Sequence, residues 1–299
     1  MMVGVKKLLV CSDMSSGSDW ALGRAALLVR DFGAECHLIH ATNTDAVLSY
    51  SDLDTGIVSL QELATQEAMR SLEAQIERCW PADLTKPTIV VVSGNPVSSI
   101  PDYASSQEVD IVLIGFQRAG IMEMLFLGTT ATRLIKRLTV PVLVVRNTPE
   151  QAYQKILVPV DFSPYAAETL LQVRRVASSA SLVLMHAFES VYEGYLTQAG
   201  IDDATIHRYR IAARDQAFKR LLALAEQGGL KQDDYTIHLI HGNPYQEILA
   251  TADSLKVDCI AVGKQGRNFV NDLLMGSVTK HVLLKAQADM LIQPASKTL

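Results

Sequence analysis

The sequence has no apolar run that approaches the roughly 20 residues of a membrane-spanning helix. Its Lys and Arg residues do not cluster, and 27 basic against 32 acidic residues leave a net charge of −5. Because non-specific binding of nucleic acid depends on neutralised phosphates, we expect no nucleic-acid partner. The apolar segment after Lys6-Lys7 is too short for the core of a signal peptide, so we interpret it as a strand. We therefore expect a cytoplasmic protein with no membrane partner.

Signatures of catalysis and of metal binding are missing as well. The seven histidines show no metal-ligand spacing, which argues against a zinc site. No Gly-x4-Gly-Lys-Ser/Thr motif occurs, which disfavours a P-loop NTPase, and no Gly-x-Ser-x-Gly motif indicates a hydrolase. The four cysteines show no CxxC spacing and are predicted to be reduced, buried thiols: Cys11, Cys36, Cys79 and Cys259.

The sequence contains an internal repeat, and such a repeat predicts the domain architecture before any single helix or strand is assigned. Lys7–Ser15 aligns with Lys155–Ser163, and Gly94–Pro96 aligns with Gly242–Pro244, both at a shift of 148 positions. The same shift relates Asp110 to Asp258, Gly115 to Gly263, and Gly128-Thr129 to Gly276-Ser277. The chain is therefore predicted to hold two domains, 1–148 and 149–299, joined at a polar segment that contains Pro149.

Short apolar strands alternate with helical patterns in both halves. We predict strands at 8–12, 35–41, 88–92, 110–114 and 142–145, and again at 156–160, 182–187, 236–240, 258–262 and 290–293. Such alternation is typical of parallel βαβ units, and hence of an α/β fold with two tandem doubly wound sheets. Ligands of these sheets lie beyond the carboxyl ends of the strands, where the strand order reverses.

A glycine-rich loop follows the predicted strand 258–262. Gly263, Gly266, Gly276 and Ser277 give the spacing Gly-x2-Gly-x9-Gly-Ser, and a helix is predicted to open at Gly276-Ser277. Glycine lets backbone N–H groups approach an anion closely, and a helix N-terminus favours negative charge. Ser277 adds a hydroxyl to this cradle or caps the helix, and an ordinary turn is the alternative for the loop as a whole.

This spacing resembles the ATP-binding signature of the universal stress protein family. The resemblance covers nearly the whole chain and implies five-stranded, Rossmann-like or flavodoxin-like sheets of order 3-2-1-4-5. It implies that ATP, ADP or AMP is bound by Pro159, Val160, Asp161, His186, Ala187, Gly263, Gly266, Gly276, Ser277 and Val278. Asp161 also fits an Asx-turn that opens a helix. Lys264 and Arg267 flank the loop and either add positive charge to the site or, as we favour, lie on the solvated surface. The presence of Mg²⁺ with the nucleotide stays open.

The first half keeps this motif only in part. Asp13, Gly115, Gly128 and Thr129 occupy equivalent positions, but Arg118 replaces the second glycine. Arginine adds a Cβ and a cation where backbone should meet phosphate, and a positive φ at this position would be strained. We therefore predict a degenerate site in residues 1–148, with binding lost or ligand choice changed.

Two functions follow from these patterns. The first is a tandem universal stress protein that binds an adenine nucleotide in residues 149–299 as a sensor or switch, with at most slow ATP hydrolysis. The alternative is a nucleotide-independent scaffold for a protein or an apolar small molecule. In either, the resemblance implies that strands 142–145 and 290–293 pair within the chain, and a homodimer is an open option. A fold like that of electron-transfer flavoproteins is disfavoured because flavin motifs are absent.

Overall fold

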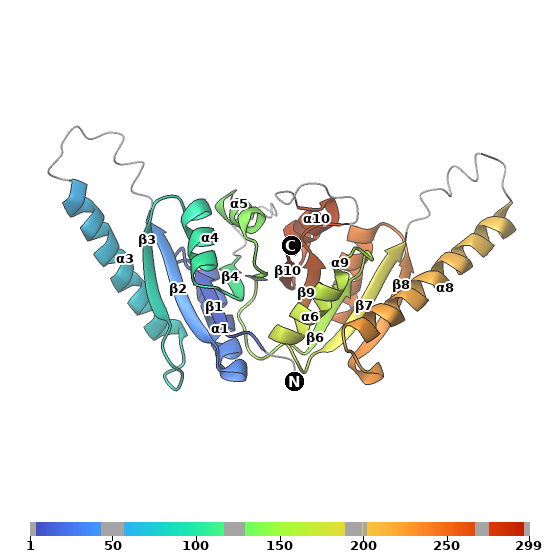
Figure 1. Ribbon diagram of the computed structural model, residues 1–299, viewed down its shortest axis with the longest axis horizontal. Helices are drawn as coiled ribbons and strands as arrows, with labels where there is room; N and C mark the ends of the chain where they lie inside the picture. The colour runs from blue at the N-terminus through green and yellow to red at the C-terminus, as the bar shows by residue number, and fades with distance from the viewer. Residues whose placement is uncertain are drawn as a thin grey trace. The chain divides into compact units, whose positions relative to one another are not determined.

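The computed structural model describes residues 4–42, 57–116, 129–188, 199, 202–266 and 275–295 (Figure 1). The chain divides into two compact units. Unit 1 comprises Met1–Ala152 together with Asp289–Pro294, and unit 2 comprises Tyr153–Ala288 together with Ala295–Leu299. The last strand in the sequence therefore belongs to the unit built by the first half.

Unit 1 is a sheet with strand order β3-β2-β1-β4-β5-β10. Its strands are β1 (Lys7–Cys11), β2 (Glu35–Thr42), β3 (Thr88–Ser93), β4 (Ile111–Gly115), β5 (Val142–Val145) and β10 (Asp289–Gln293). Its helices are α1 (Ser16–Phe32), α3 (Ile57–Cys79), α4 (Pro96–Ser106) and α5 (Thr129–Arg137), and α3 runs along β3 (Figure 1). The first five strands are parallel and confirm the expected order 3-2-1-4-5. The sixth, β10, pairs antiparallel with β5, so the expected pairing of the two last strands is present.

Unit 2 repeats the same arrangement with its strands in the order β9-β6-β7-β8. The strands are β6 (Lys155–Pro159), β7 (Ser181–Phe188), β8 (Tyr235–His241) and β9 (Cys259–Gly263). The helices are α6 (Ala166–Val176), α8 (Asp203–Gln227), α9 (Pro244–Leu255) and α10 (Ser277–Lys285), with a 3₁₀ turn at η1 (Gln232–Asp234). All described pairs of these strands are parallel. Five strands were expected in each sheet, whereas the observed units hold six and four because β10 is counted with unit 1.

The central strands are buried on both faces, as parallel sheets covered by helices require. Leu8, Leu9 and Val10 of β1 are fully buried, and so are Ile156 and Leu157 of β6. These continuous apolar runs explain why the strands could be placed from the sequence. No helix in the described ranges is both long and apolar enough to cross a bilayer.

One aspartate in each unit fixes the register at the start of the central strand. Asp110 Oδ2 accepts hydrogen bonds from the backbone N–H groups of Lys6 at 2.8 Å and Lys7 at 3.0 Å. Asp258 Oδ2 accepts from the equivalent groups, with 2.8 Å to Lys155 N. Because each carboxylate joins the start of one strand to its neighbour, the carboxyl ends of β1 and β4, and of β6 and β9, are brought level.

A buried carboxylate anchors β10 in unit 1. Asp289 is 1% exposed, and its Oδ1 accepts a hydrogen bond from Arg146 N at 2.8 Å. Its Oδ2 lies 3.6 Å from the guanidinium of Arg24, which is itself buried on α1. A buried charge is stable only when it is paired and hydrogen-bonded, so Asp289 links β10 to β5 and α1.

Candidate functional site

Unit 2 contains a cavity of about 390 Å³ at the carboxyl ends of β6, β7 and β9. We call it the C-terminal cavity. Its wall consists of Pro159, Val160, Asp161, Met185, His186, Ala187, Pro244, Ile248, Val262, Gly263, Gln265, Gly266, Gly276, Ser277, Val278 and Thr279. All ten residues proposed from the sequence for this half lie on that wall, so the structure brings them together.

Asp161 lies beside the glycine loop although about a hundred residues separate them in the sequence. Its Oδ1 accepts a hydrogen bond from Ser163 N at 2.9 Å, which is the Asx-turn expected as its second role. Its Oδ2 lies 3.2 Å from the point where a Cβ on Gly266 would stand. The turn thus uses one carboxylate oxygen and directs the other toward the loop.

The base of the glycine loop is closed by two hydrogen bonds. Gly276 N donates to Lys264 O at 2.9 Å, and Thr279 Oγ1 donates to Gly263 O at 2.8 Å. Thr279 is 6% exposed and belongs to the first turn of α10. These bonds hold the start of α10 against the end of β9, with the cavity between them and Asp161.

The N-terminus of α10 opens on this cavity. Gly276, not Ser277, is the N-cap residue, and it supplies no capping side chain. The interpretation of Ser277 as a helix cap is therefore wrong, and Ser277 is the first helical residue with an exposed side chain. Since the first N–H groups of a helix have no intrahelical acceptor, they are available to an anion together with the Ser277 hydroxyl.

A Cβ at position 266 would make a tight contact of 3.2 Å with the Asp161 carboxylate. Gly266 does not adopt a positive φ, so a larger residue at this position would not be strained by a left-handed backbone. A small side chain at 266 would require the Asp161 carboxylate to shift slightly. A side chain at 266 would enter the room between Asp161 and the start of α10.

The opposite side of the cavity is built around His186. Its Nδ1 lies 2.7 Å from Val160 O, and because a carbonyl only accepts, Nδ1 carries the proton. The ring packs against Phe162 at 4.5 Å between centroids. Phe162 adopts a φ of 57°, which is unusual for an aromatic residue. The guanidinium of Arg220 on α8 lies over the Phe162 ring, 4.0 Å from its centroid. The tight turn after Asp161 is thus stabilised from β7 and α8.

Lys264 corrects one expectation. It was interpreted as solvated surface, but it is only 4% exposed, and its carbonyl accepts the hydrogen bond from Gly276 N. Arg267 lies outside the described residues.

Six wall residues were not predicted: Met185, Pro244, Ile248, Val262, Gln265 and Thr279. The repeat of Gly-Asn-Pro could have indicated Pro244, since that motif recurs at the same shift in both halves.

Unit 1 has a cavity of about 460 Å³ at the equivalent place, which we call the N-terminal cavity. Its wall consists of Cys11, Ser12, Asp13, Ser15, His40, Ala41, Pro96, Ile100, Ile114, Gly115, Phe116, Thr130, Ala131 and Leu134. Of the residues proposed for this half, Asp13 and Gly115 lie on the wall, whereas Thr129 is exposed and does not. Arg118 and Gly128 lie outside the described residues. A Cβ on Gly115 would collide with the backbone of Gly17, so this glycine is needed for the packing of α1 on β4.

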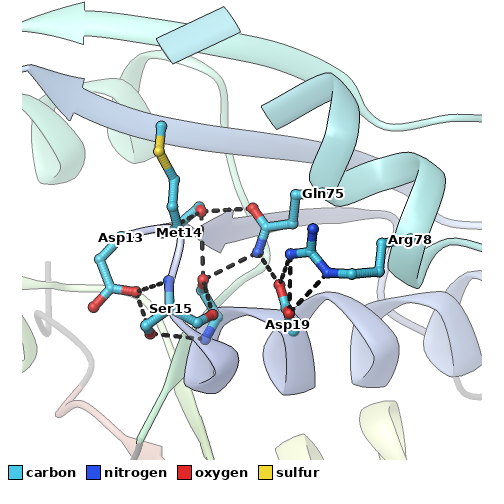
Figure 2. A network of polar contacts seen from close by, with 8 residues as sticks. Asp13, Met14, Ser15, Asp19, Gln75 and Arg78 are labelled. Atoms are coloured by element: carbon cyan, nitrogen blue, oxygen red, sulfur yellow. Dashed lines mark hydrogen bonds and ion pairs between the residues drawn. The ribbon is translucent and has the colours of Figure 1, made fainter. Parts of the chain in front are cut away.

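A polar network supports the loop that carries Asp13 (Figure 2). Asp13 Oδ1 accepts from Ser15 N at 3.1 Å, and Ser12 Oγ lies 2.7 Å from Gln75 Oε1 on α3. Gln75 Nε2 donates to Asp19 at 2.8 Å, and Asp19 also pairs with Arg78 (Figure 2). The Ser12 and Gln75 side chains therefore satisfy each other between β1 and α3, away from solvent.

The cysteine in this cavity is not activated. Burial, together with the negative charge of Asp13, raises the pKa of the Cys11 thiol to about 12. All four cysteines are free thiols. Cys36 and Cys259 are buried as expected, whereas Cys11 and Cys79 are partly exposed. Within the described part of the chain, no three His, Cys, Asp or Glu side chains gather as metal ligands.

Fold and cavities together define a tandem of doubly wound α/β domains with a ligand-sized cavity at each switch point. The model of the universal stress protein family matches the chain twice, over residues 4–146 and 152–294. The chain therefore belongs to the universal stress protein family.

Individual relatives agree with this assignment. A universal stress protein E homolog from Haemophilus influenzae is 20% identical over 312 residues, which cover 98% of each chain. Universal stress protein MJ0577 from Methanocaldococcus jannaschii is 25% identical over 155 residues, 47% of this chain and 94% of that protein. The crystal structure of a universal stress protein from Archaeoglobus fulgidus has the same fold, with a TM-score of 0.62 at 18% identity over 97% of this chain and 98% of that one.

Proposed function

We propose that this protein binds ATP or another adenine nucleotide in the C-terminal cavity and acts by binding, as a nucleotide-linked sensor or switch in a stress response. One observation carries the proposal. Asp161, Gly266 and the open N-terminus of α10 face one another across a single cavity. A phosphate chain meets backbone donors and a helix dipole at one side, and the ribose meets a carboxylate.

The base would lie at the other side, against apolar residues. Val160, Ala187 and Ile248 supply this part of the wall. The combination of an apolar face with a few converging polar groups is typical of small-molecule sites. An adenine ring, which is flat and weakly polar, suits that surface better than a second charged group would.

The decisive experiment compares wild-type protein with Gly266→Arg. An arginine at 266 would direct its guanidinium into the space between Asp161 and α10, where it pairs with the carboxylate and takes the place of phosphate. We expect wild type to release an adenine nucleotide on denaturation, identified by mass spectrometry, and Gly266→Arg to release none. Gln227→Arg, with the same added charge at the exposed end of α8, is the control and should bind normally.

Thermal unfolding gives an independent measurement. A ligand that binds the native state raises the melting temperature, so wild type and Gln227→Arg should shift upward at millimolar ATP and Gly266→Arg should not. Full ATP affinity in Gly266→Arg would contradict the proposal.

The second candidate is a nucleotide-independent scaffold, and the outer face of α8 favours it. Ile211, Phe218 and Leu222 recur at helical spacing on α8 and are 48%, 44% and 40% exposed. A protein partner, a second copy of the chain included, would bury them. Absence of any thermal shift with ATP, combined with dimerisation that is lost in Phe218→Ser, would favour this function.

A further inference from the structure

The first half of α8 is exposed on every side. The helix lies beside β8, the last strand in the order of unit 2 (Figure 1). Residues 207–216 are all exposed, whereas a helix that packs along a sheet buries one side at every turn. Helices in proteins gain most of their stability from the packing of an amphipathic face. This half of α8 therefore has a surface available to a partner.

An apolar stripe runs along α8 and faces away from the centre of the sheet. Ile211, Phe218 and Leu222 follow one another at intervals of seven and four residues, so they share one side of the helix, and all three are exposed. Arg220, two residues after Phe218, reaches back to the ring of Phe162 beside β6. Since residues two apart lie on nearly opposite sides of a helix, the stripe faces outward.

Unit 1 shows that the fold does not need this stripe. The buried sides of α3 and α8 align at a shift of 149 positions, at which Ile211 and Leu222 correspond to the exposed residues Glu62 and Glu73. Because the equivalent helix carries charges at these places, the apolar residues of α8 serve something other than the packing of the unit. The aligned buried pairs are Ala68 and Ala217, Leu72 and Leu221, and Ile76 and Ala225.

Four exposed charges flank the stripe on one side and alternate in sign. They are spaced by seven, four and seven residues and lie about 60° round the helix from the stripe. From the N-terminus they are Arg208, Asp215, Lys219 and Glu226. Their signs run plus, minus, plus, minus in one direction and minus, plus, minus, plus in the other. An antiparallel copy of α8 therefore places an opposite charge against each of them.

The apolar stripe fits the same register as the charges. The pairs Arg208 with Glu226 and Asp215 with Lys219 are both centred on position 217. The same centre, to within half a residue, places Ile211 of one helix opposite Leu222 of the other. A two-fold interface requires this kind of self-complementarity, in which each residue faces a partner that faces it in turn.

We propose that a second copy of the chain docks on α8, with the two α8 helices packed antiparallel across a two-fold axis near position 217. The apolar stripes form the centre of this interface and the alternating charges form its rim. The pairing names the partner of the α8 face described above, and it stands whether or not the C-terminal cavity binds a nucleotide. One pair of helices makes a small interface, so we expect a reversible dimer with a Kd of about 1 to 100 µM.

Sedimentation velocity of the full chain without nucleotide, over about 1 to 200 µM, tests this proposal. Ile211→Glu gives α8 the residue that α3 carries as Glu62, so the fold should be retained while the Kd of the dimer rises about thirtyfold or more. Glu77→Arg is the control, because Glu77 of α3 is equivalent to Glu226 and lies outside the interface. It should leave the Kd unchanged, and circular dichroism verifies that both variants are folded.

A charge exchange tests the antiparallel register. Arg208→Glu or Glu226→Arg alone brings like charges together twice per dimer, and each should weaken the dimer about tenfold. Neither change opposes the dipole of α8, since one adds negative charge toward its N-terminus and the other adds positive charge at its C-terminus. The double variant restores opposite charges across the axis and should return the Kd to within about threefold of wild type.

Three results would overturn the inference: a wild type that is monomeric at about 200 µM, a dimer that persists in Ile211→Glu, or a double variant no tighter than the single ones. If monomeric wild type instead sediments with vesicles that contain phosphatidylserine, and Ile211→Glu does not, α8 binds a membrane surface and the second copy is excluded. An intact dimer in a protein that binds no ATP refutes the nucleotide function alone.

Discussion

Thr279→Val removes one hydroxyl from the wall of the C-terminal cavity and keeps the shape of the side chain. The lost bond to Gly263 O is 2.8 Å long and Thr279 is 6% exposed, so little water can replace it. A hydrogen bond of this kind contributes about 1 kcal/mol to stability, and we expect the free energy of unfolding to fall by about 1 to 2 kcal/mol. Urea denaturation measures this directly.

The effect on binding should depend on phosphate. Without this bond, only the hydrogen bond from Gly276 N to Lys264 O ties the start of α10 to the end of β9, so the donors for the phosphate chain are held less firmly. We expect the Kd for ATP to rise about threefold to tenfold and the Kd for adenosine to stay within about twofold. Both are measured by calorimetry.

Two controls separate positioning from general destabilisation. Thr279→Ser keeps the hydroxyl and should retain wild-type ATP affinity. Thr169→Val makes the same substitution at a buried residue of α6 whose Oγ1 donates to Tyr165 O at 3.4 Å, and Thr169 is not on the cavity wall. It should lower stability without changing either Kd. Equal loss of ATP and adenosine binding in Thr279→Val would refute the reasoning.

Two further predictions concern unit 1. Asp289→Ala removes a carboxylate that is 1% exposed and paired with Arg24, so unit 1 should lose about 3 to 5 kcal/mol in urea denaturation, and a loss below about 1 kcal/mol would contradict the anchoring role. The hydrogen bond from His37, then the charge of Lys7, lowers the pKa of Glu35, so its stabilising contribution is present above the unfolded pKa and lost as the pH falls through the folded value. The stability difference between wild type and Glu35→Gln should therefore shrink as the pH falls below about 4, whereas a difference that is constant from neutral to acid pH would exclude this linkage.

Local pattern accounts for the elements that the sequence predicted correctly. The strands are continuous apolar runs, which can be recognised from neighbouring residues alone. The repeat at a shift of 148 positions, which aligns Gly94–Pro96 with Gly242–Pro244, predicts the same alternation of strands and helices in both halves. The glycine spacing at Gly263, Gly266 and Gly276 likewise indicated where a helix start would meet a strand end.

Tertiary packing decided what neighbouring residues do not encode. Only the folded chain shows that Asp289 anchors β10 in unit 1 and that Lys264 is buried. Gly276 is the N-cap of α10, and the Thr279 hydroxyl bonds to Gly263 O, because β9 and α10 pack together. The local sequence between them does not specify how close β9 and α10 lie. Periodicity and turn chemistry act over a few residues, whereas these contacts join segments far apart in the chain, and their geometry follows from how the units pack.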